Sequence, residues 1–521
     1  MQTSQPGGKE TKPDPCDQGT RTGTQTNRTT VAHRKTNRRR RVLNQHSPNP
    51  AESLATLLET QKAHQAEHGA PNAAERKDRI ARLIDLVLDN RDALIDAISA
   101  DFGNRSQHET IAADIAGTVK QLKFARDNLD RWMRPEKAKV EFPLGLLGAR
   151  GRIHYQPLGV IGIVSPWNFP IYLAIGPMAE AFAAGNSVML KPSEFTSRTS
   201  DLLKALIEAN FAPHEAVVVT GGVDVAQAFT ALPFDHLLFT GASTIGPHVL
   251  RAAAEHMVPT TLELGGKNPA IIAPSADMNL AVARIAAGKG FNAGQVCLAP
   301  DYVLVPRAKM EEFATQLAAK LAEAFPTLSG NPDVTHIVTD RQFDRLKGLV
   351  EQARSAGARV VQVNPANEDL SATNEKILPP TLIVDADPAL DVMQDEIFGP
   401  ILPILPYDSL DQAISFANAR PRPLAAYVFA KDTGEQEQVM ESTISGGACI
   451  NETIMHSTQN TLPFGGVGNS GMGAYHGLHG FKRFSHAKAI FKQINMDGVF
   501  KALRPPYGEK FFKTMAPFLK K

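Results

Sequence analysis

Cys297 and Glu263 are the two side chains whose types and spacing most directly suggest chemistry. Cys297 closes the segment Phe291-Asn292-Ala293-Gly294-Gln295-Val296-Cys297, and Glu263 stands 34 residues before it in Leu262-Glu263-Leu264-Gly265-Gly266. A cysteine thiolate is a strong nucleophile at neutral pH, and a partly desolvated glutamate can activate a water molecule. The pair predicts an acyl-transfer or aldehyde-oxidising enzyme, although a free cysteine is more often a buried packing residue.

Short apolar runs that alternate with helical patterns must position these side chains. Residues 51–135 are typical of helices, and helical patterns also cover 175–184, 199–209 and 308–325. The apolar runs that predict strands lie at 160–164, 187–190, 216–220, 236–239, 302–305 and 425–429. Strand–helix alternation favours parallel sheets with helices on both faces, so we expect an α/β fold with two doubly wound domains.

Two further segments stand at the ends of predicted strands. Lys191 and Glu194 follow the run 187–190, and the turn from Gly241 to Gly246 follows the run 236–239 and opens a helix. Ligands of parallel sheets bind at the carboxyl ends of strands, where a carboxylate can accept from ribose hydroxyls. Small residues at a helix N-terminus let backbone amides approach a phosphate. Each signal is weak alone, since GxxxxG is not the GxGxxG dinucleotide motif and Lys191 and Glu194 also suit an exposed turn.

Composition excludes several classes of protein. The 521 residues are 43% hydrophobic and 21% charged with a net charge of +1, as in an ordinary globular protein of two or three domains. The charge gives no overall field for nucleic acid or membranes, and no apolar run reaches the length of a membrane span. Cys16, Cys297 and Cys449 are far apart, which predicts no disulfide framework and no metal site. We expect a reducing, cytoplasmic location.

The first 50 residues differ from the rest of the chain. They hold ten lysines and arginines against three acidic residues, hence a charge of +7, and almost no large apolar side chains. This composition predicts a disordered tail. The run of four arginines at 38–41 is also consistent with a nucleic-acid patch or a targeting signal.

Taken together, the motifs resemble the NAD(P)-dependent aldehyde dehydrogenases. Six segments occur in the family's order and spacing over roughly residues 60–500: Pro166-Trp167-Asn168-Phe169-Pro170, Lys191-Pro192-Ser193-Glu194, the turn from Phe239 to Gly246, Leu262-Glu263-Leu264-Gly265-Gly266, Gly294-Gln295-Val296-Cys297 and Glu396-Ile397-Phe398-Gly399-Pro400. The segments Asn451–His456 and Pro463–Gly477 are similar to the class 3 branch of that family. The stretch from Tyr155 onward is most similar to bacterial coniferyl aldehyde dehydrogenases.

The resemblance implies catalytic roles for three residues. Cys297 would attack the aldehyde to give a thiohemiacetal, and the Asn168 side-chain amide and the Cys297 N–H would bind the oxyanion. Hydride transfer to the cofactor would leave a thioester, which Glu263 would hydrolyse by activating water. We expect Cys297 to be a thiolate, and Glu263 to have a pKa raised by an apolar site and nearby negative charge.

The resemblance also implies a cofactor, NAD first and NADP as the alternative, and no metal. Lys191 and Glu194 would contact the adenosine ribose, and Gly241, Ser243 and Gly246 the pyrophosphate. Glu396 would bind the nicotinamide ribose beside Phe398. One departure concerns Ala242 and Ser243, where many members have Ser-Thr. The hydroxyl that could cap the next helix then either comes from Ser243 or is lost.

The expected architecture is a Rossmann-like cofactor domain, a catalytic domain and a small oligomerisation arm. The tail would cover 1–50 and the NAD-binding domain 51–265, with part of the arm near 136–153. The catalytic domain would cover 266–460. Residues 461–521 would return to the cofactor domain and supply a strand at about 484–500, which predicts a homodimer.

The expected reaction is oxidation of an aromatic aldehyde, such as coniferyl aldehyde to ferulate. Medium- or long-chain aliphatic aldehydes, a semialdehyde and a coenzyme A-acylating reaction are the alternatives within the family. A scaffold without catalysis, with the arginine run binding RNA, is the alternative outside it. His456 and Cys449 are expected to be packing residues, although His456 could also shape the substrate pocket.

Overall fold

The structure is a computed structural model that describes residues 50–142 and 144–521. The predicted tail, with Cys16 and the arginine run, lies outside the described residues except for Pro50, which begins the first helix. Within the described ranges, every helix is too short or too polar to traverse a lipid bilayer. Nor do these residues bring three His, Cys, Asp or Glu side chains close enough to share a metal ion.

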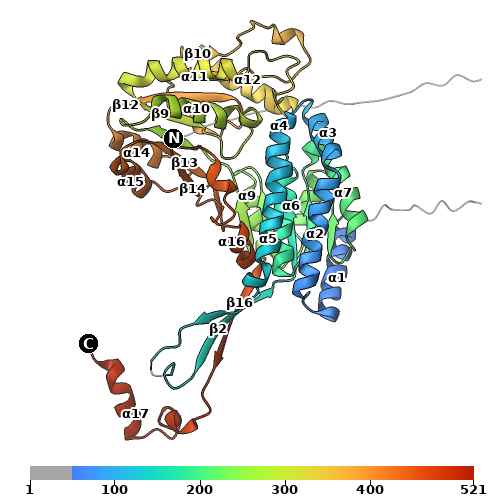
Figure 1. The fold of residues 1–521 in the computed structure, drawn as a ribbon, viewed down its shortest axis with the longest axis vertical. Helices are drawn as coiled ribbons and strands as arrows, with labels where there is room; N and C mark the ends of the chain where they lie inside the picture. Colours follow the sequence, from blue (N-terminus) through green and yellow to red (C-terminus); the bar gives the residue numbers. More distant parts are fainter. Residues whose placement is uncertain (1–49, 143) are drawn as a thin grey trace, which may run out of the picture. The chain divides into compact units, whose positions relative to one another are not determined.

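The N-terminal part is helical, as predicted. Its helices are α1 (Pro50–His68), α2 (Ala73–Asp89), α3 (Arg91–Phe102), α4 (Gln107–Thr110) and α5 (Thr118–Trp132). Asn72 starts α2 with a capping box that it shares with Glu75. The apolar positions Ile80, Leu83 and Val87 face the core because they recur at helical spacing. In Figure 1, α2 and α5 lie side by side with α6 (Tyr172–Ala184), and the three helices pack on one another.

One turn of this helical region is not α-helical. Residues Ile111–Gly117 form a π-helix, η1, between α4 and α5. The Thr118 hydroxyl donates to the Asp114 carbonyl at 2.5 Å within this wider turn. The Asp114 side chain is fully buried on the same turn. Wide turns of this kind are frequent at functional sites, and the sequence pattern predicted only helices over residues 51–135, without a π-helical turn.

The first large sheet has the strand order β15-β7-β6-β3-β4-β5. Its strands are β3 (Val160–Val164), β4 (Ser187–Lys191), β5 (Ala216–Val218), β6 (His236–Thr240), β7 (Thr260–Glu263) and β15 (Gly471–Met472). The helices that follow them are α6, α7 (Ser197–Asn210), α8 (Val223–Thr230), α9 (Gly246–Ala254) and α16 (Gly477–Arg483). All pairs are parallel except β15 with β7, and four of the predicted strands are confirmed here.

The second large sheet has the order β10-β11-β12-β9-β8-β13-β14. Its strands are β8 (Pro269–Ile272), β9 (Tyr302–Pro306), β10 (Arg359–Gln362), β11 (Thr381–Val384), β12 (Ile401–Tyr407), β13 (Ala425–Phe429) and β14 (Gly447–Ile450). Its helices are α10 (Met278–Gly290), α11 (Met310–Ala324), α12 (Asp340–Ser355), α13 (Asp391–Gln394), α14 (Leu410–Asn418) and α15 (Thr433–Ser442). Only β10 pairs antiparallel, with β11, and every other pair in this sheet is parallel. The parallel strands and the helices that connect them confirm a second α/β sheet. The exact domain boundaries, such as residue 265, remain a prediction.

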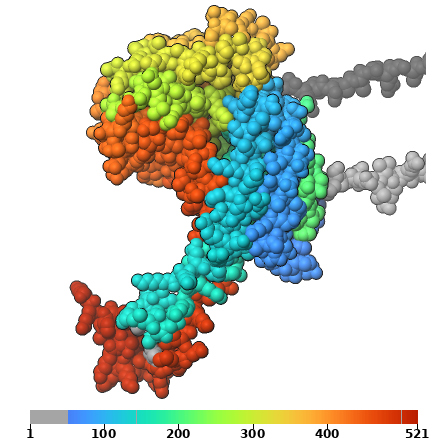
Figure 2. Space-filling model, viewed as in Figure 1, coloured from blue at the N-terminus to red at the C-terminus, as the bar shows by residue number. Residues whose placement is uncertain are grey.

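A third, antiparallel sheet joins two segments that lie far apart in the sequence. It consists of β1 (Glu136–Ala138), β2 (Arg150–Pro157) and β16 (Ser485–Lys492), in the order β1-β2-β16. Ser485 pairs with Pro157 and Lys492 with Arg150, so β16 follows β2 along its whole length. The chain then continues to α17 (Glu509–Met515). Figure 2 shows this C-terminal part beside the β1–β2 segment.

Candidate active site

The loop that carries Cys297 has an uncommon backbone. Asn292 and Ala293 both have φ of 50°, a left-handed conformation that costs free energy for residues other than glycine. Gly294 has φ of 70°, and a Cβ there would lie 2.3 Å from the Gly399 carbonyl oxygen. The loop can therefore approach the segment after Glu396 only because residue 294 has no side chain.

The Gln295 side chain holds this loop in place. Its amide nitrogen donates to the carbonyls of Asn292 at 3.1 Å and His336 at 3.0 Å. Its amide oxygen accepts from the Val338 N–H at 3.0 Å. Gln295 is fully buried, so its bonds form in a low dielectric and resist exchange with water.

Asn268 holds the nucleophile itself. Its side-chain nitrogen donates to the Cys297 carbonyl at 2.7 Å and to the Ala299 carbonyl at 3.0 Å. Its side-chain oxygen accepts from the Ala425 N–H at 2.9 Å. No role was predicted for Asn268 or Gln295 from the sequence, although both stand in the glycine-containing segments that carry Glu263 and Cys297. A buried amide among small residues is the signal that could have found them.

Cys297 itself is half-buried, and its sulfur accepts from the backbone N–H groups of Cys297 and Leu298. Burial first, and then the charges of Glu396 and Glu263, raise the pKa of the thiol to about 12, although the two N–H groups lower it by a smaller amount. A pKa in this range favours the protonated thiol at neutral pH in the folded chain by itself, so the thiol must lose its proton during the reaction. The expectation of a thiolate beside a nicotinamide stays a prediction.

Glu263 ends strand β7 and is buried. Neither carboxylate oxygen has a hydrogen-bond partner among the described residues. Burial raises the pKa of this carboxyl well above its ordinary value, as expected. The expected nearby negative charge is not the cause, because the charge that acts on Glu263 is the Arg483 guanidinium, which lowers its pKa.

Asn168 lies on the loop after β3 and is buried against the nucleophile loop. Its side-chain nitrogen donates to the Gln295 carbonyl at 3.2 Å, which leaves the second amide hydrogen free for another acceptor. Its own carbonyl accepts from Arg105 at 2.9 Å and from the Asn292 side chain at 3.3 Å. The structure thus brings together Asn168, Glu263 and Cys297, which lie on three separate stretches of sequence.

The cofactor candidates lie along the carboxyl edge of the first sheet. The chain runs from β3 to β4 and β5 on one side, and then returns to β6 and β7 on the other. Ligands bind outside such a switch point, here between β3 and β6. The hydroxyls of Ser165 and Thr240 stand at the ends of these two strands, buried and without a partner in the described part of the chain. No role was predicted for either residue from the sequence.

The other residues expected to hold the cofactor surround this edge. Lys191 is buried at the end of β4 and forms an ion pair of 2.9 Å with Glu194. Gly241 starts the turn after β6, and Gly246 begins α9. The Ser243 hydroxyl donates to the Gly265 carbonyl at 3.2 Å, and α9 has no side-chain cap. Ser243 therefore joins two loops rather than capping the helix.

Glu396 and Phe398 approach the same region from the second sheet. The Glu396 carboxylate lies so close to Gly265 that a Cβ there would be 1.8 Å from its oxygen. Burial raises the pKa of Glu396 to about 8, with a contribution from Asp301. Phe398 has φ of 50°, and its ring meets Trp167 edge-on at 5.3 Å between centroids.

Comparison with known proteins agrees with this geometry. Residues 26–490 match the profile of the aldehyde dehydrogenase family. The chain belongs to the aldehyde dehydrogenase family. It is 50% identical over 467 residues to a probable coniferyl aldehyde dehydrogenase of Caulobacter vibrioides, covering 89% of this chain and 96% of the relative. It is 48% identical over 473 residues to the coniferyl aldehyde dehydrogenase of a Pseudomonas species, covering 91% and 98%.

Solved structures of aldehyde dehydrogenases share the fold. A substrate-bound state of Staphylococcus aureus AldH has a TM-score of 0.83 and 35% identity, over 89% of this chain and 99% of that one. The Mycobacterium tuberculosis aldehyde dehydrogenase complexed with NAD+ has a TM-score of 0.76 and 26% identity, over 86% and 91%. The protein is therefore an oxidoreductase of this family.

In this aldehyde dehydrogenase, Cys297 opens into a cavity of about 650 Å³. The lining is predominantly apolar and includes the aromatic rings of Phe169, Tyr172, Phe291 and Phe464. Concave apolar sites of this size bind small organic molecules. His456 does not line the cavity. Its Nδ1 lies 3.2 Å from the Cys449 sulfur, behind the lining residues Ile454 and Met455.

Proposed function

We propose that this enzyme oxidises an aromatic aldehyde of the coniferyl aldehyde type to its carboxylic acid, with NAD as hydride acceptor. The observation that carries the proposal is that the Cys297 thiol faces a cavity lined by aromatic and aliphatic side chains. A flat phenylpropenal can bury its ring there while its carbonyl reaches the sulfur. The names of the relatives at 48% and 50% identity support this substrate class.

The edge of the first sheet fits NAD. The unpartnered Ser165 and Thr240 hydroxyls supply hydrogen-bonding groups at the switch point. Lys191 and Glu194 would contact the adenosine ribose, where the Glu194 carboxylate favours NAD over a cofactor with an added phosphate. Gly241, Ser243 and Gly246 would lie at the pyrophosphate, and Glu396 and Phe398 at the nicotinamide end. When bound, NAD supplies the acceptor for the hydride of the substrate.

The chain's own residues would then act in sequence. The Cys297 sulfur bonds to the carbonyl carbon, and the oxyanion accepts from the free amide hydrogen of Asn168 and from the Cys297 N–H. Preorganised donors of this kind stabilise developing charge without reorganisation, and one of them contributes about 10²–10³ in rate. Loss of hydride leaves a thioester on Cys297.

The charges of two carboxyls, Glu396 and Glu263, act on the thiol. Both have raised pKa values, so each, once ionised, is a stronger base than an ordinary glutamate. We assign the hydrolytic step to Glu263, which removes a proton from the water that attacks the thioester. This step argues against transfer of the acyl group to coenzyme A.

We also propose a homodimer that forms through the arm, in the cytoplasm. Strand β16 exposes Phe491, and the β1–β2 segment exposes Phe142 and Leu146, which are 76% and 82% accessible. Exposed apolar side chains on an edge sheet favour association with a second copy. Light scattering should give twice the chain mass, and a monomer across a wide concentration range would contradict the proposal.

The function is tested by following NADH absorbance with coniferyl aldehyde, benzaldehyde and hexanal. Wild type should give the highest kcat/KM with coniferyl aldehyde, and Cys297→Ala should lose at least ~10⁴-fold in kcat. Cys449→Ala is the matched control, since that thiol contacts His456 outside the cavity. Higher kcat/KM with hexanal would favour the aliphatic alternative. Acyl-coenzyme A on addition of coenzyme A would contradict the hydrolytic step.

A further inference from the structure

Arg105 and Asp114 form an ion pair in the interior of the protein. Their side chains are 0% exposed, and a guanidinium nitrogen lies 3.0 Å from Asp114 Oδ2. The guanidinium also lies over the rings of Phe102 and Phe169, at 5.3 and 4.9 Å from their centroids. Removing two charges from water costs more free energy than the pair commonly returns, so a buried pair is poorly explained by stability alone.

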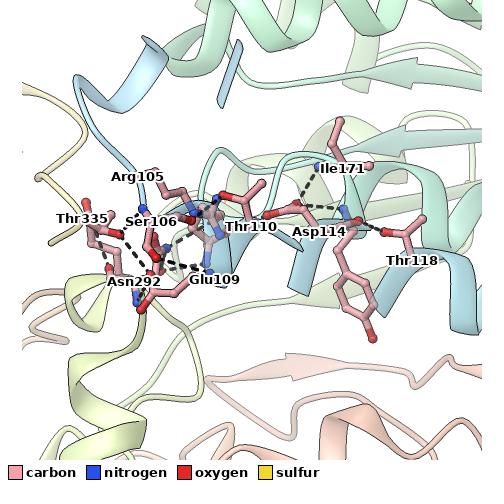
Figure 3. Close-up of polar contacts among 12 residues, drawn as sticks. Arg105, Ser106, Glu109, Thr110, Asp114, Thr118, Ile171, Asn292 and Thr335 are labelled. Carbon is pink, nitrogen blue, oxygen red and sulfur yellow. Dashed lines mark hydrogen bonds and ion pairs between the residues drawn. The ribbon is translucent and has the colours of Figure 1, made fainter. Parts of the chain in front are cut away.

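Asp114 holds the far end of the loop that carries Asn168. Its Oδ1 accepts from the backbone N–H groups of Ile171 and Tyr172, at 3.0 and 3.1 Å. These amides open helix α6, whose own N-terminal residue Ile171 provides no side-chain cap. A carboxylate there satisfies two unpaired donors and opposes the positive end of the helix dipole. The π-helical turn η1 presents Asp114 to them, as Figure 3 shows.

Arg105 holds the near end of the same loop. One guanidinium nitrogen donates to the Asn168 carbonyl at 2.9 Å. A planar guanidinium holds its nitrogens at a fixed separation, and here one nitrogen donates to the Asn168 carbonyl while another lies in the ion pair with the Asp114 carboxylate. The five-residue stretch from Asn168 to Tyr172 is thus bonded at both ends to one ion pair.

The same segment also contacts the nucleophile loop. The Glu109 carboxylate accepts from the Asn292 N–H and from the Thr335 hydroxyl, each at 3.0 Å. Asn292 in turn donates to the Asn168 carbonyl at 3.3 Å. Figure 3 shows Arg105, Glu109 and Asn292 gathered at one end of this network, which extends to Asp114 at the other. Residues 105–114 therefore touch both loops whose separation sets the distance from the Asn168 amide to Cys297.

We infer that Arg105 and Asp114 are positioning residues that fix the Asn168 amide as an oxyanion donor against Cys297. The inference rests on the role of Asn168 in the proposed function. Its physical basis is that an oxyanion hole must hold its donors in place before charge develops. Loosening the loop should weaken binding of the oxyanion and leave the thiol and the cofactor edge unchanged.

The test compares Arg105→Lys with Arg79→Lys. Both changes replace the planar guanidinium of a buried arginine. Arg79, however, forms its ion pair with Glu215, at 3.0 Å, and not with the Asn168 loop. Lysine keeps a positive charge beside Asp114 but lacks the planar guanidinium that faces Asn168 and Asp114 at a fixed separation. We expect kcat/KM for the aldehyde to fall ~10-fold for Arg105→Lys and to stay within about twofold for Arg79→Lys.

Two readouts separate positioning from a merely structural role. Alkylation of Cys297 by iodoacetamide needs the thiol but no oxyanion donor, so its rate, followed by peptide mass spectrometry, should not change in Arg105→Lys. In a double-mutant cycle, Asn168→Ala should remove the effect of Arg105→Lys, since both act through the same donor. Additive losses, or an alkylation rate that falls in parallel with kcat/KM, would overturn the inference.

A second variant covers a failure of Arg105→Lys to fold. The combined change Arg105→Met with Asp114→Asn leaves neither member of the ion pair charged and keeps an oxygen that can accept the Ile171 and Tyr172 amides. It should lose ~10–100-fold in kcat/KM, again only while Asn168 is present. Full activity in this variant would overturn the inference. If Asn168→Ala alone keeps full activity, the proposed oxyanion role itself is wrong, which is a distinguishable result.

Discussion

The amide side chains around Cys297 bond to the protein itself, whereas the hydroxyls at the ends of β3 and β6 do not. Asn268 and Gln295 each make three hydrogen bonds that tie the nucleophile loop to neighbouring segments. The hydroxyl oxygens of Ser165 and Thr240 are also buried and have no partner among the described residues. Both sets surround one site and differ in where their hydrogen-bond partners come from.

The amides and the hydroxyls meet two different requirements of one reaction. Groups that must stabilise a developing charge gain by being fixed beforehand, because no free energy is then spent on reorganisation. Groups that bind a ligand must keep hydrogen-bonding capacity in reserve, and an unpartnered buried polar group in a native structure calls for such an explanation. The substrate side is thus preorganised, and the cofactor edge is completed by what binds there.

Glu263 is the proposed general base of the hydrolytic step, and its removal should have the largest effect on the rate. Glu263→Gln should lower steady-state kcat by ~10²–10⁴, because the thioester loses its general base. The first turnover should still release NADH in a burst, since hydride transfer precedes hydrolysis of the thioester. Rapid-mixing absorbance measures both phases. Loss of the burst together with kcat would place Glu263 in the attack of Cys297 as well.

The same variant has a pH signature. A raised pKa means that Glu263 ionises only as the pH rises well above the ordinary range of a carboxyl. Wild-type kcat should therefore rise with pH between the ordinary pKa of a glutamate and the raised pKa of Glu263, and the variant should lack the rise. In the same interval the folded chain keeps a proton that the unfolded chain has lost, so stability falls as pH increases. Urea titrations of Glu263→Gln should show a weaker fall.

A substitution on the preorganised side should affect both rate and stability. Asn268→Ala removes the bonds to the Cys297 and Ala299 carbonyls and leaves the Ala425 N–H without its acceptor. We expect a loss of about 1–3 kcal/mol in unfolding free energy and a ~10²-fold fall in kcat/KM for the aldehyde. Unchanged kcat/KM in a folded variant would show that the nucleophile loop does not need this support.

A substitution at the cofactor edge should have the smallest effect, and this effect should be confined to cofactor binding. Thr240→Val keeps the shape of the side chain and removes a buried hydroxyl that has no partner. The apo protein should lose no stability, since no bond is broken. KM for NAD should rise several-fold, because the lost hydrogen bond contributes ~1 kcal/mol to binding. Lower stability without a change in KM would reverse the comparison between the two sides.

Much of the fold was predictable because its signals are local. The apolar runs at 160–164 and 425–429 became β3 and β13, since strands buried on both faces need continuous apolar sequence. The chemistry of Cys297, Glu263 and Asn168 was accessible because each stands in a motif that resembles one family. The resemblance placed an arm at about 136–153 and 484–500, but the pairing of β2 with β16 within the chain was not predicted, because local sequence does not specify it.

Other features were not predictable because they depend on contacts between distant residues. Arg105 meets Asn168 across 63 positions and Asn268 meets Cys297 across 29, and neither distance leaves a periodic pattern. The π-helical turn at Ile111–Gly117 was read as ordinary helix. The raised pKa of the Cys297 thiol was not predicted either, because a pKa depends on burial and on charges brought near by folding.

The sequence by itself determined which elements form and which residue types carry the chemistry, since periodicity and motif spacing are properties of neighbouring residues. Only the tertiary structure decided how those residues act. It joined the strand ends into a cofactor edge with unpartnered hydroxyls, and it buried Cys297 beside two carboxyls. It also placed the Arg105–Asp114 pair under the loop of Asn168. The reason is that burial, hydrogen bonding and electrostatic coupling depend on distances in space, which the order of residues along the chain does not specify locally.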